Sequence, residues 1–167
     1  MRRTLTITFL TALAATIYGT TSAQAQVMPK KLVEVAKSRS CEPLNDFFNS
    51  DDLLDPPYAL GYLPGDRESS AVFFCRRGNE FFLMVAIFDD RLKFSCQTEI
   101  PYPGNPSGLR ILGGKSVPLH LFRYVDPPHR YGPKTVKTRG PIIEDYYDGV
   151  LNWFYCHDGK WLRRFLH

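Results

Sequence analysis

Three residues with catalytic potential stand next to one another near the C-terminus: Cys156, His157 and Asp158. A nucleophile, a base and a group that orients the base are the parts of a covalent catalyst. Consecutive side chains of a strand point to opposite faces, however, so Cys156 and His157 cannot act on one substrate from these positions. A cysteine held in a disulfide also has no thiolate with which to attack. We therefore expect a structural cysteine beside a hairpin histidine, and we assign no catalytic residue.

Acidic residues form two groups that offer paired carboxylates. The later group, Glu144, Asp145 and Asp148, is the candidate for a glycoside hydrolase pair, whereas the group at residues 51–55 has the character of a solvated loop. The later group follows no calcium-loop pattern, and the histidines lack the spacing of zinc ligands. The sequence contains no nucleophile elbow, phosphate-binding loop or dinucleotide fingerprint. We expect no metal site and no cofactor.

A basic and aromatic stretch precedes the later acidic group. Residues 123–139 carry arginines, lysines and tyrosines against a single acid, Asp126. Arginine and tyrosine are favoured at binding hot spots, and long irregular loops are often functional. The alternative is an ordinary surface loop whose charges pair with the neighbouring acids. From this stretch and the tyrosines that follow it, we select the candidate binding residues Arg123, Arg130, Tyr131, Lys134, Tyr146 and Tyr147.

The N-terminus has the three parts of a secretory signal. Arg2 and Arg3 precede an uncharged apolar stretch, and Ala23-Gln24-Ala25 supplies the small residues of a cleavage site. The apolar stretch is too short and too rich in threonine to span a membrane. The sequence therefore predicts a cleaved signal at residues 1–25 and a single β-rich domain at residues 26–167, periplasmic or secreted, without a membrane span after cleavage.

The net charge of the mature chain limits which classes of partner the sequence indicates. Arg2 and Arg3 are two of the 21 basic residues, against 17 acidic ones, so the mature chain keeps a net charge of only +2. This excess is too small to indicate nucleic acid as the partner. The expected ligand of the basic loop is an anionic glycan or an acidic protein surface. A non-enzymatic binding module is preferred, and the alternative is a hydrolase of cell-wall glycans or an inhibitor of such an enzyme.

The inhibitor alternative is motivated by a short resemblance. Ser-Gly-Leu-Arg-Ile at residues 107–111 is similar to the Ser-Gly-x-Arg-Tyr stretch of small periplasmic lysozyme-inhibitor barrels. The likeness covers five positions, and Ile111 stands in place of the tyrosine.

The elements that must position these residues follow from apolar periodicity. Residues 29–37 and a second segment from Pro43 to Phe48 have helical spacing. The unbroken apolar run at 80–88 is typical of a strand covered on both faces. We expect an α+β fold that is mainly antiparallel sheet, with two short N-terminal helices. The expected strands are a meander of residues 71–75, 80–88 and 91–96, a C-terminal hairpin at 152–162 and further strands at 109–112 and 117–124.

Four cysteines in an exported chain predict two disulfides. In the expected meander Cys75 lies opposite about Phe82, and Cys96 flanks the same central strand on its other side. Two strand spacings separate them by about 9–10 Å, beyond the reach of a disulfide. A direct Cys75–Cys96 bridge is therefore disfavoured. Two pairings stay open, 41–75 with 96–156 and 41–96 with 75–156, and we prefer Cys41–Cys96 with Cys75–Cys156.

Overall fold

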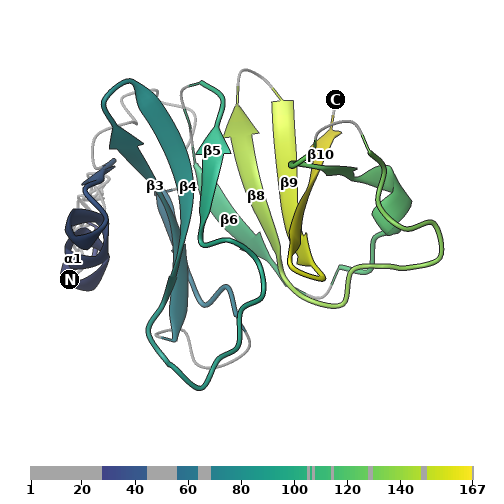
Figure 1. Cartoon of the computed structure of the whole chain (residues 1–167), viewed down its shortest axis with the longest axis horizontal. Coiled ribbons are helices and arrows are strands. Elements are labelled where there is room, and N and C mark those ends of the chain that lie inside the picture. The colour runs from purple at the N-terminus through teal and green to yellow at the C-terminus, as the bar shows by residue number, and fades with distance from the viewer. Residues whose placement is uncertain are drawn as a thin grey trace, which may run out of the picture.

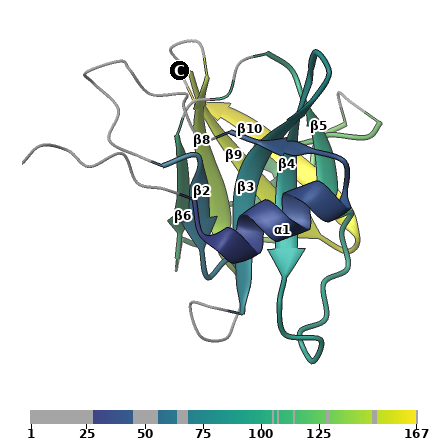
Figure 2. The ribbon, with the colours of Figure 1, turned by 90° about the vertical axis from the view of Figure 1, so that its left-hand side faces the viewer.

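The computed structural model describes residues 28–44, 56–63, 69–104, 106, 108–113, 115–127, 130–147 and 150–166. Most of the described chain forms two antiparallel sheets of five strands each, and one α-helix lies on the outer side of the first sheet (Figures 1 and 2). The predicted signal peptide, residues 1–25, lies outside the described residues.

The first sheet, sheet A, has the strand order β1–β3–β4–β5, and β2 pairs with the same edge of β3 as β1. Cys75 of β3 lies opposite Phe82 of β4, as predicted. Gly78, with φ of +60°, turns the chain between these two strands. Side chains on both faces of β3 and β4 are buried, which confirms the prediction from the apolar run at 80–88. The strands are β1 (Glu42–Pro43), β2 (Tyr58–Leu60), β3 (Ser70–Arg77), β4 (Glu80–Ile87) and β5 (Glu99–Tyr102).

The predicted third strand of the meander lies later in the chain than expected. Residues 91–96 form no strand; instead, the Asp89 carboxylate accepts hydrogen bonds from the backbone amide and the guanidinium of Arg91 at 2.7–3.0 Å. This local interaction turns the chain away from β4. The pairing partner of β4 is β5, with Met84 opposite Glu99.

Helix α1 (Lys30–Ser38) confirms the first predicted helix and packs across the outer face of sheet A (Figure 2). Leu32 and Ala36 are its buried residues. The described residues contain no second α-helix. Pro43, the expected start of that helix, belongs to β1 and lies opposite Cys75. The rest of the expected helix, residues 45–48, lies outside the described residues.

The second sheet, sheet B, has the order β6–β8–β9–β10–β7. The predicted C-terminal hairpin is β9 and β10, joined by Asp158 and Gly159, whose φ angles of +47° and +76° suit a two-residue turn. The strands are β6 (Leu109–Leu112), β7 (Arg123–Tyr124), β8 (Ile142–Tyr147), β9 (Val150–His157) and β10 (Lys160–Leu166).

The strand predicted at residues 117–124 is mostly absent. Pro118 makes an isolated bridge to Lys137, the 3-10 helix η1 (Leu119–Leu121) follows, and only β7 is extended strand. Proline has no amide hydrogen for a strand ladder. The chain after Pro118 instead forms the 3-10 turn that buries Leu119 against the outer face of sheet B.

The two sheets pack face to face around the main core, and in Figure 1 the layers follow from left to right as α1, sheet A, sheet B and the segment between β6 and β8. Side chains from both sheets meet in the middle, among them Phe74, Leu83, Ile143, Phe154 and Trp161. None of the described helices is long and apolar enough to cross a membrane.

The disulfides join Cys41 to Cys75 and Cys96 to Cys156. Our preferred pairing, Cys41–Cys96 with Cys75–Cys156, was therefore wrong, and the other open pairing is correct. Cys75 lies in the layer beneath α1, whereas Cys156 packs against the core between the sheets, on the other side of sheet A. The expectation that Cys75 and Cys96 are not bridged directly is confirmed, although Cys96 lies outside the strands of sheet A. Two disulfides indicate an oxidising, non-cytoplasmic environment.

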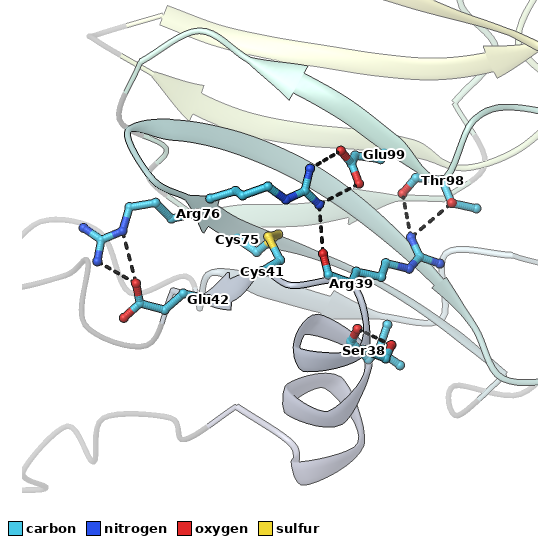
Figure 3. Close-up of a disulfide and its surroundings, with 10 residues drawn as sticks. Ser38, Arg39, Cys41, Glu42, Cys75, Arg76, Thr98 and Glu99 are labelled. Atoms are coloured by element: carbon cyan, nitrogen blue, oxygen red, sulfur yellow. Dashed lines mark hydrogen bonds and ion pairs between the residues drawn. A yellow bond between two sulfur atoms is a disulfide. The ribbon is translucent and has the colours of Figure 1, made fainter.

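Each disulfide fastens one layer to sheet A. Cys41–Cys75 ties the end of α1 to β3 (Figure 3), and Cys96–Cys156 ties the chain before β5 to β9 of sheet B.

Removal of the first disulfide in C41A/C75A should loosen α1 selectively. We expect the free energy of unfolding to fall by about 2–4 kcal/mol, measured by urea denaturation. Amide hydrogen exchange should accelerate in α1 while the protection of β9 and β10 persists. Unchanged protection of α1 would contradict the role assigned to Cys41–Cys75.

Candidate functional site

The strongest candidate site lies at the β7 side of sheet B. The Arg123 guanidinium carbon Cζ lies 5.3 Å from the ring centroid of Tyr131, and Nη2 donates a hydrogen bond to the tyrosine Oη at 3.2 Å. Tyr131 is 61% exposed, the most exposed of the large hydrophobic side chains that the structure describes. The ring is thus held from one direction by a cation and presents the rest of its surface to solvent.

The chain around Tyr131 extends sheet B beyond β7. Arg123 and Tyr131 form an antiparallel bridge, the Tyr124 amide donates to the Arg130 carbonyl at 2.8 Å, and the Gly132 amide donates to the Phe122 carbonyl at 2.9 Å. A Cβ at Gly132 would lie 2.3 Å from the Leu119 carbonyl oxygen. Only glycine therefore allows this close approach to η1, which fixes the position of Tyr131.

Further cations lie along the same edge of sheet B. Arg130 is exposed beside Tyr131, and Lys134 is exposed in the following turn. The Lys160 ammonium lies 5.6 Å from the ring centroid of Tyr124 on the neighbouring strand. We call Arg123, Tyr124, Arg130, Tyr131 and Lys160 the β7 edge. Arg123 pairs with Arg163 and Tyr124 with Leu162, so Tyr124 and Lys160 lie on the outer face of this edge and Arg123 with Tyr131 on the other face.

Sequence reasoning missed Lys160. It stands 36 positions from Tyr124 in the chain and is brought to it by the pairing of β10 with β7. The only local signal is that Lys160, Leu162 and Arg164 alternate along β10 and share one face.

The two remaining candidate residues lie apart from the β7 edge. Tyr146 is on β8, and β9 and β10 separate β8 from β7. Three strand spacings correspond to about 14 Å. Nothing is described of the Tyr147 side chain. The structure therefore brings Arg123, Arg130 and Tyr131 together and leaves Tyr146 on another surface.

The carboxylates of Glu144 and Asp145 point to opposite faces of sheet B. Glu144 Oε2 accepts a hydrogen bond from the Trp153 indole on the outer face at 2.7 Å. Asp145 is buried between the sheets, where Tyr102 and Asn152 donate to its Oδ2. Two carboxylates on opposite faces cannot flank one glycosidic bond. Asp148 lies outside the described residues.

Asp145 is the centre of a polar chain that crosses the core. Arg163 of β10 donates to the Asn152 amide oxygen at 3.1 Å, and Asn152 Nδ2 donates to Asp145 Oδ2 at 3.1 Å. Tyr102 of sheet A completes the chain. Burial raises the pKa of the Asp145 carboxyl from 3.8 to about 6, against the opposing effects of the Tyr102 and Asn152 hydrogen bonds and the Arg163 charge.

The other candidates for chemistry are structural. Cys156 is oxidised, and His157 Nε2 lies 3.3 Å from the carboxylate of Asp158 in the hairpin turn. Over the described ranges, no group of three or more His, Cys, Asp or Glu side chains is arranged to hold a metal ion.

A shallow depression beside Cys41–Cys75 carries arginines that are already paired (Figure 3). Arg76 Nη2 lies 2.6 Å from Glu42 Oε2, and Arg77 Nη1 lies 2.9 Å from Glu99 Oε1. Arg77 also donates to the Arg39 carbonyl at 3.0 Å. These contacts join the end of α1 to β3 and β5, so we interpret the depression as part of the scaffold.

The chain matches no protein-family model, no curated protein and no solved structure. The chemistry of its own surface is therefore the basis for a functional assignment.

The buried Asp145 carboxyl should make stability fall as pH rises. Its pKa is higher in the folded than in the unfolded chain, so the folded state binds the proton more tightly. The free energy of unfolding should therefore decrease between pH 4 and pH 6, by at most about 3 kcal/mol for this group. D145N should flatten this decrease in urea titrations across that range.

The matched control is E144Q, which alters the preceding residue on the outer face and should keep the pH dependence. An identical slope in D145N and the unsubstituted protein would show that Asp145 is not its source.

Proposed function

We propose that this protein is a non-enzymatic binding module of the periplasm or the extracellular space, and that its β7 edge binds an anionic glycan. The observation that carries the proposal is the Tyr131 ring, which is 61% exposed and held by the Arg123 guanidinium. The predicted signal peptide and the two disulfides support the compartment.

The chemistry of the β7 edge suits an acidic sugar. The exposed side of an aromatic ring offers a flat apolar surface to the apolar face of a sugar ring, and guanidinium groups bind carboxylates through parallel hydrogen bonds. Arg123 and Tyr131 are already in contact before any ligand binds. Less side-chain entropy is therefore lost on binding than for two freely rotating side chains.

The charge of the β7 edge is available to a ligand. In the part of the chain that the structure describes, Arg123, Arg130 and Lys160 form no ion pair. This favours a binding surface over the alternative of a loop whose charges pair with neighbouring acids. Exposed cations also increase the rate at which an anionic ligand associates, by an amount that falls with salt.

A glycan hydrolase has less support. Its carboxylate pair was expected at Glu144, Asp145 and Asp148, and the first two lie on opposite faces of sheet B. The binding module needs no such pair.

Replacement of Tyr131 or Arg123 should weaken binding to soluble anionic glycans. The probes are polygalacturonate and sonicated peptidoglycan fragments, titrated calorimetrically at low and physiological salt, with neutral dextran as the uncharged comparison. For Y131A and R123A we expect affinity losses of about tenfold or more, as for hot-spot residues. Binding of the unsubstituted protein should weaken as salt increases.

Y146A is the matched control because it removes a tyrosine of the same sheet on a strand about 14 Å from β7, and it should bind as the unsubstituted protein does. Equal affinity of Y131A and the unsubstituted protein, or equal binding to dextran, would exclude the β7 edge as an anionic-glycan site.

A further inference from the structure

Among the residues that the structure describes, those that cover the outer face of sheet B lie over one half of it. The segment between β6 and β8 lies over the half that contains Ile142, Tyr155 and Leu162, where it buries Leu119 and Phe122. The other half, towards the C-terminal ends of β8 and β10, carries two cross-strand rows of side chains. We call these two rows the open half of sheet B.

The first row runs across four strands in register. Arg110 lies opposite Glu144, Glu144 opposite Trp153, and Trp153 opposite Arg164. Because paired residues of neighbouring strands point to the same face, all four side chains lie on the outer face. The row therefore combines three polar groups with one large aromatic side chain.

Two cations lie against the ring of Trp153. The Lys115 ammonium lies 4.7 Å and the Arg164 guanidinium carbon 5.4 Å from its ring centroid. The indole N–H is meanwhile bonded to Glu144. Each cation is held by the negative potential of the ring face.

Lys115 is held in place by its backbone. The hydroxyl of the buried Thr138 donates to the Lys115 carbonyl at 2.6 Å and accepts from the Val117 amide at 2.9 Å. The chain at Lys115 is therefore fixed against a distant part of the same segment. This limits the entropy that the site loses when it binds a ligand.

The two cations are available to an anion. Across the described residues, neither Lys115 nor Arg164 forms an ion pair with a carboxylate. Both cations lie at the same indole ring, and that contact does not neutralise their charge. An acidic ligand that reaches Trp153 would therefore find two positive groups there.

The second row is apolar and partly exposed. Tyr146 lies opposite Leu151, and Leu151 opposite Leu166. Tyr146 is 36% and Leu151 37% exposed. Leu151 and Trp153 are two residues apart on one strand, so the apolar row lies about 7 Å from the cationic row.

We propose that the open half of sheet B docks an extended acidic segment of a partner protein. A carboxylate of that segment binds between Lys115 and Arg164, and an apolar side chain two residues away covers Leu151. The distance of about 7 Å between the two rows favours an extended chain as the ligand, because side chains at i and i+2 of an extended chain share one face and lie about 7 Å apart.

A protein segment fits this surface better than a membrane does. Tyr146 and Leu151 are about two-thirds covered, so they offer little apolar surface for insertion into a bilayer. A partner chain can approach the sheet face and cover them. The site is also separate from Arg123 and Tyr131, because Arg123 pairs with Arg163 and therefore lies on the opposite face of sheet B from Arg164.

Two labelled octapeptides of equal composition test the spacing. In the first, threonine alternates with glutamate and leucine, so that both fall on one side of an extended chain. In the second, glutamate and leucine occupy adjacent positions on opposite sides. Fluorescence anisotropy should show that the first binds at least about fivefold more tightly. Equal affinity of the two peptides, or no binding of either, would overturn the proposal.

Substitution of the cations locates the binding site. K115A/R164A should weaken binding of the first peptide by about tenfold or more, whereas K30A/K37A, which removes two cations from α1, should not. The emission of Trp153 should also respond to the peptide, measured in W161F because the buried Trp161 is the other tryptophan.

Two further measurements separate this surface from its alternatives. Y131A should bind the first peptide normally, so that failure of the glycan site leaves this site intact. Vesicles of phosphatidylglycerol serve as the lipid probe. Stronger binding to these vesicles than to the first peptide, abolished in K115A/R164A, would assign the surface to membranes and overturn the proposal.

Discussion

The central strands of sheet A are apolar on both faces, and the rest of the molecule is arranged to cover them. Phe73 and Met84 lie beneath α1, whereas Phe74 and Leu83 face sheet B. Burial of each such side chain contributes about 1.5–3 kcal/mol, but only while a covering layer stays in place. A single nine-residue helix is a weak cover because isolated helices of this length are marginal in water. The two disulfides keep the covering layers in place, since one fastens α1 to β3 and the other fastens sheet B to the chain before β5.

Short-range patterns in the sequence predicted the hairpins well, but they could not predict which residues far apart in the chain lie close together. Gly78 and the pair Asp158-Gly159 determine their turns locally, so the position of Cys75 opposite Phe82 followed from the sequence. The start of β5 did not, because the Asp89–Arg91 interaction adds irregular chain where a tight turn was expected. The disulfide pairing depended on which face of sheet A each cysteine joins, and that requires the two-sheet packing. The sequence indicated the Arg123–Tyr131 region. It could not indicate that Lys160 lies at the same edge or that Tyr146 lies apart from it, because both relations depend on the strand order of sheet B.

The polar chain between the two sheets lowers the stability of the fold when Asp145 is ionised, but it defines how the sheets are aligned. Arg163, Asn152, Asp145 and Tyr102 link β10, β9 and β8 of sheet B to β5 of sheet A. An apolar interface of the same size permits small shifts of one sheet over the other, whereas hydrogen bonds with defined partners select one alignment. The charge of Asp145 makes that alignment less stable when the carboxyl ionises, which is the price of a carboxylate at this position. The alignment matters for function because β10 carries both Lys160 and Arg164, one at each proposed surface.

The segment between β6 and β8 accounts for both surfaces. It covers one half of the outer face of sheet B, and no other described segment covers the second half. Its first residues supply Lys115, and its later residues supply Tyr131. Two contacts hold these parts, the hydrogen bond of Thr138 to the Lys115 carbonyl and the approach of Gly132 to η1. A long connection with little regular structure is usually tolerated in a compact domain when it has a function. Here it is anchored to sheet B at several points, and these contacts hold both Lys115 and Tyr131 at the two proposed surfaces.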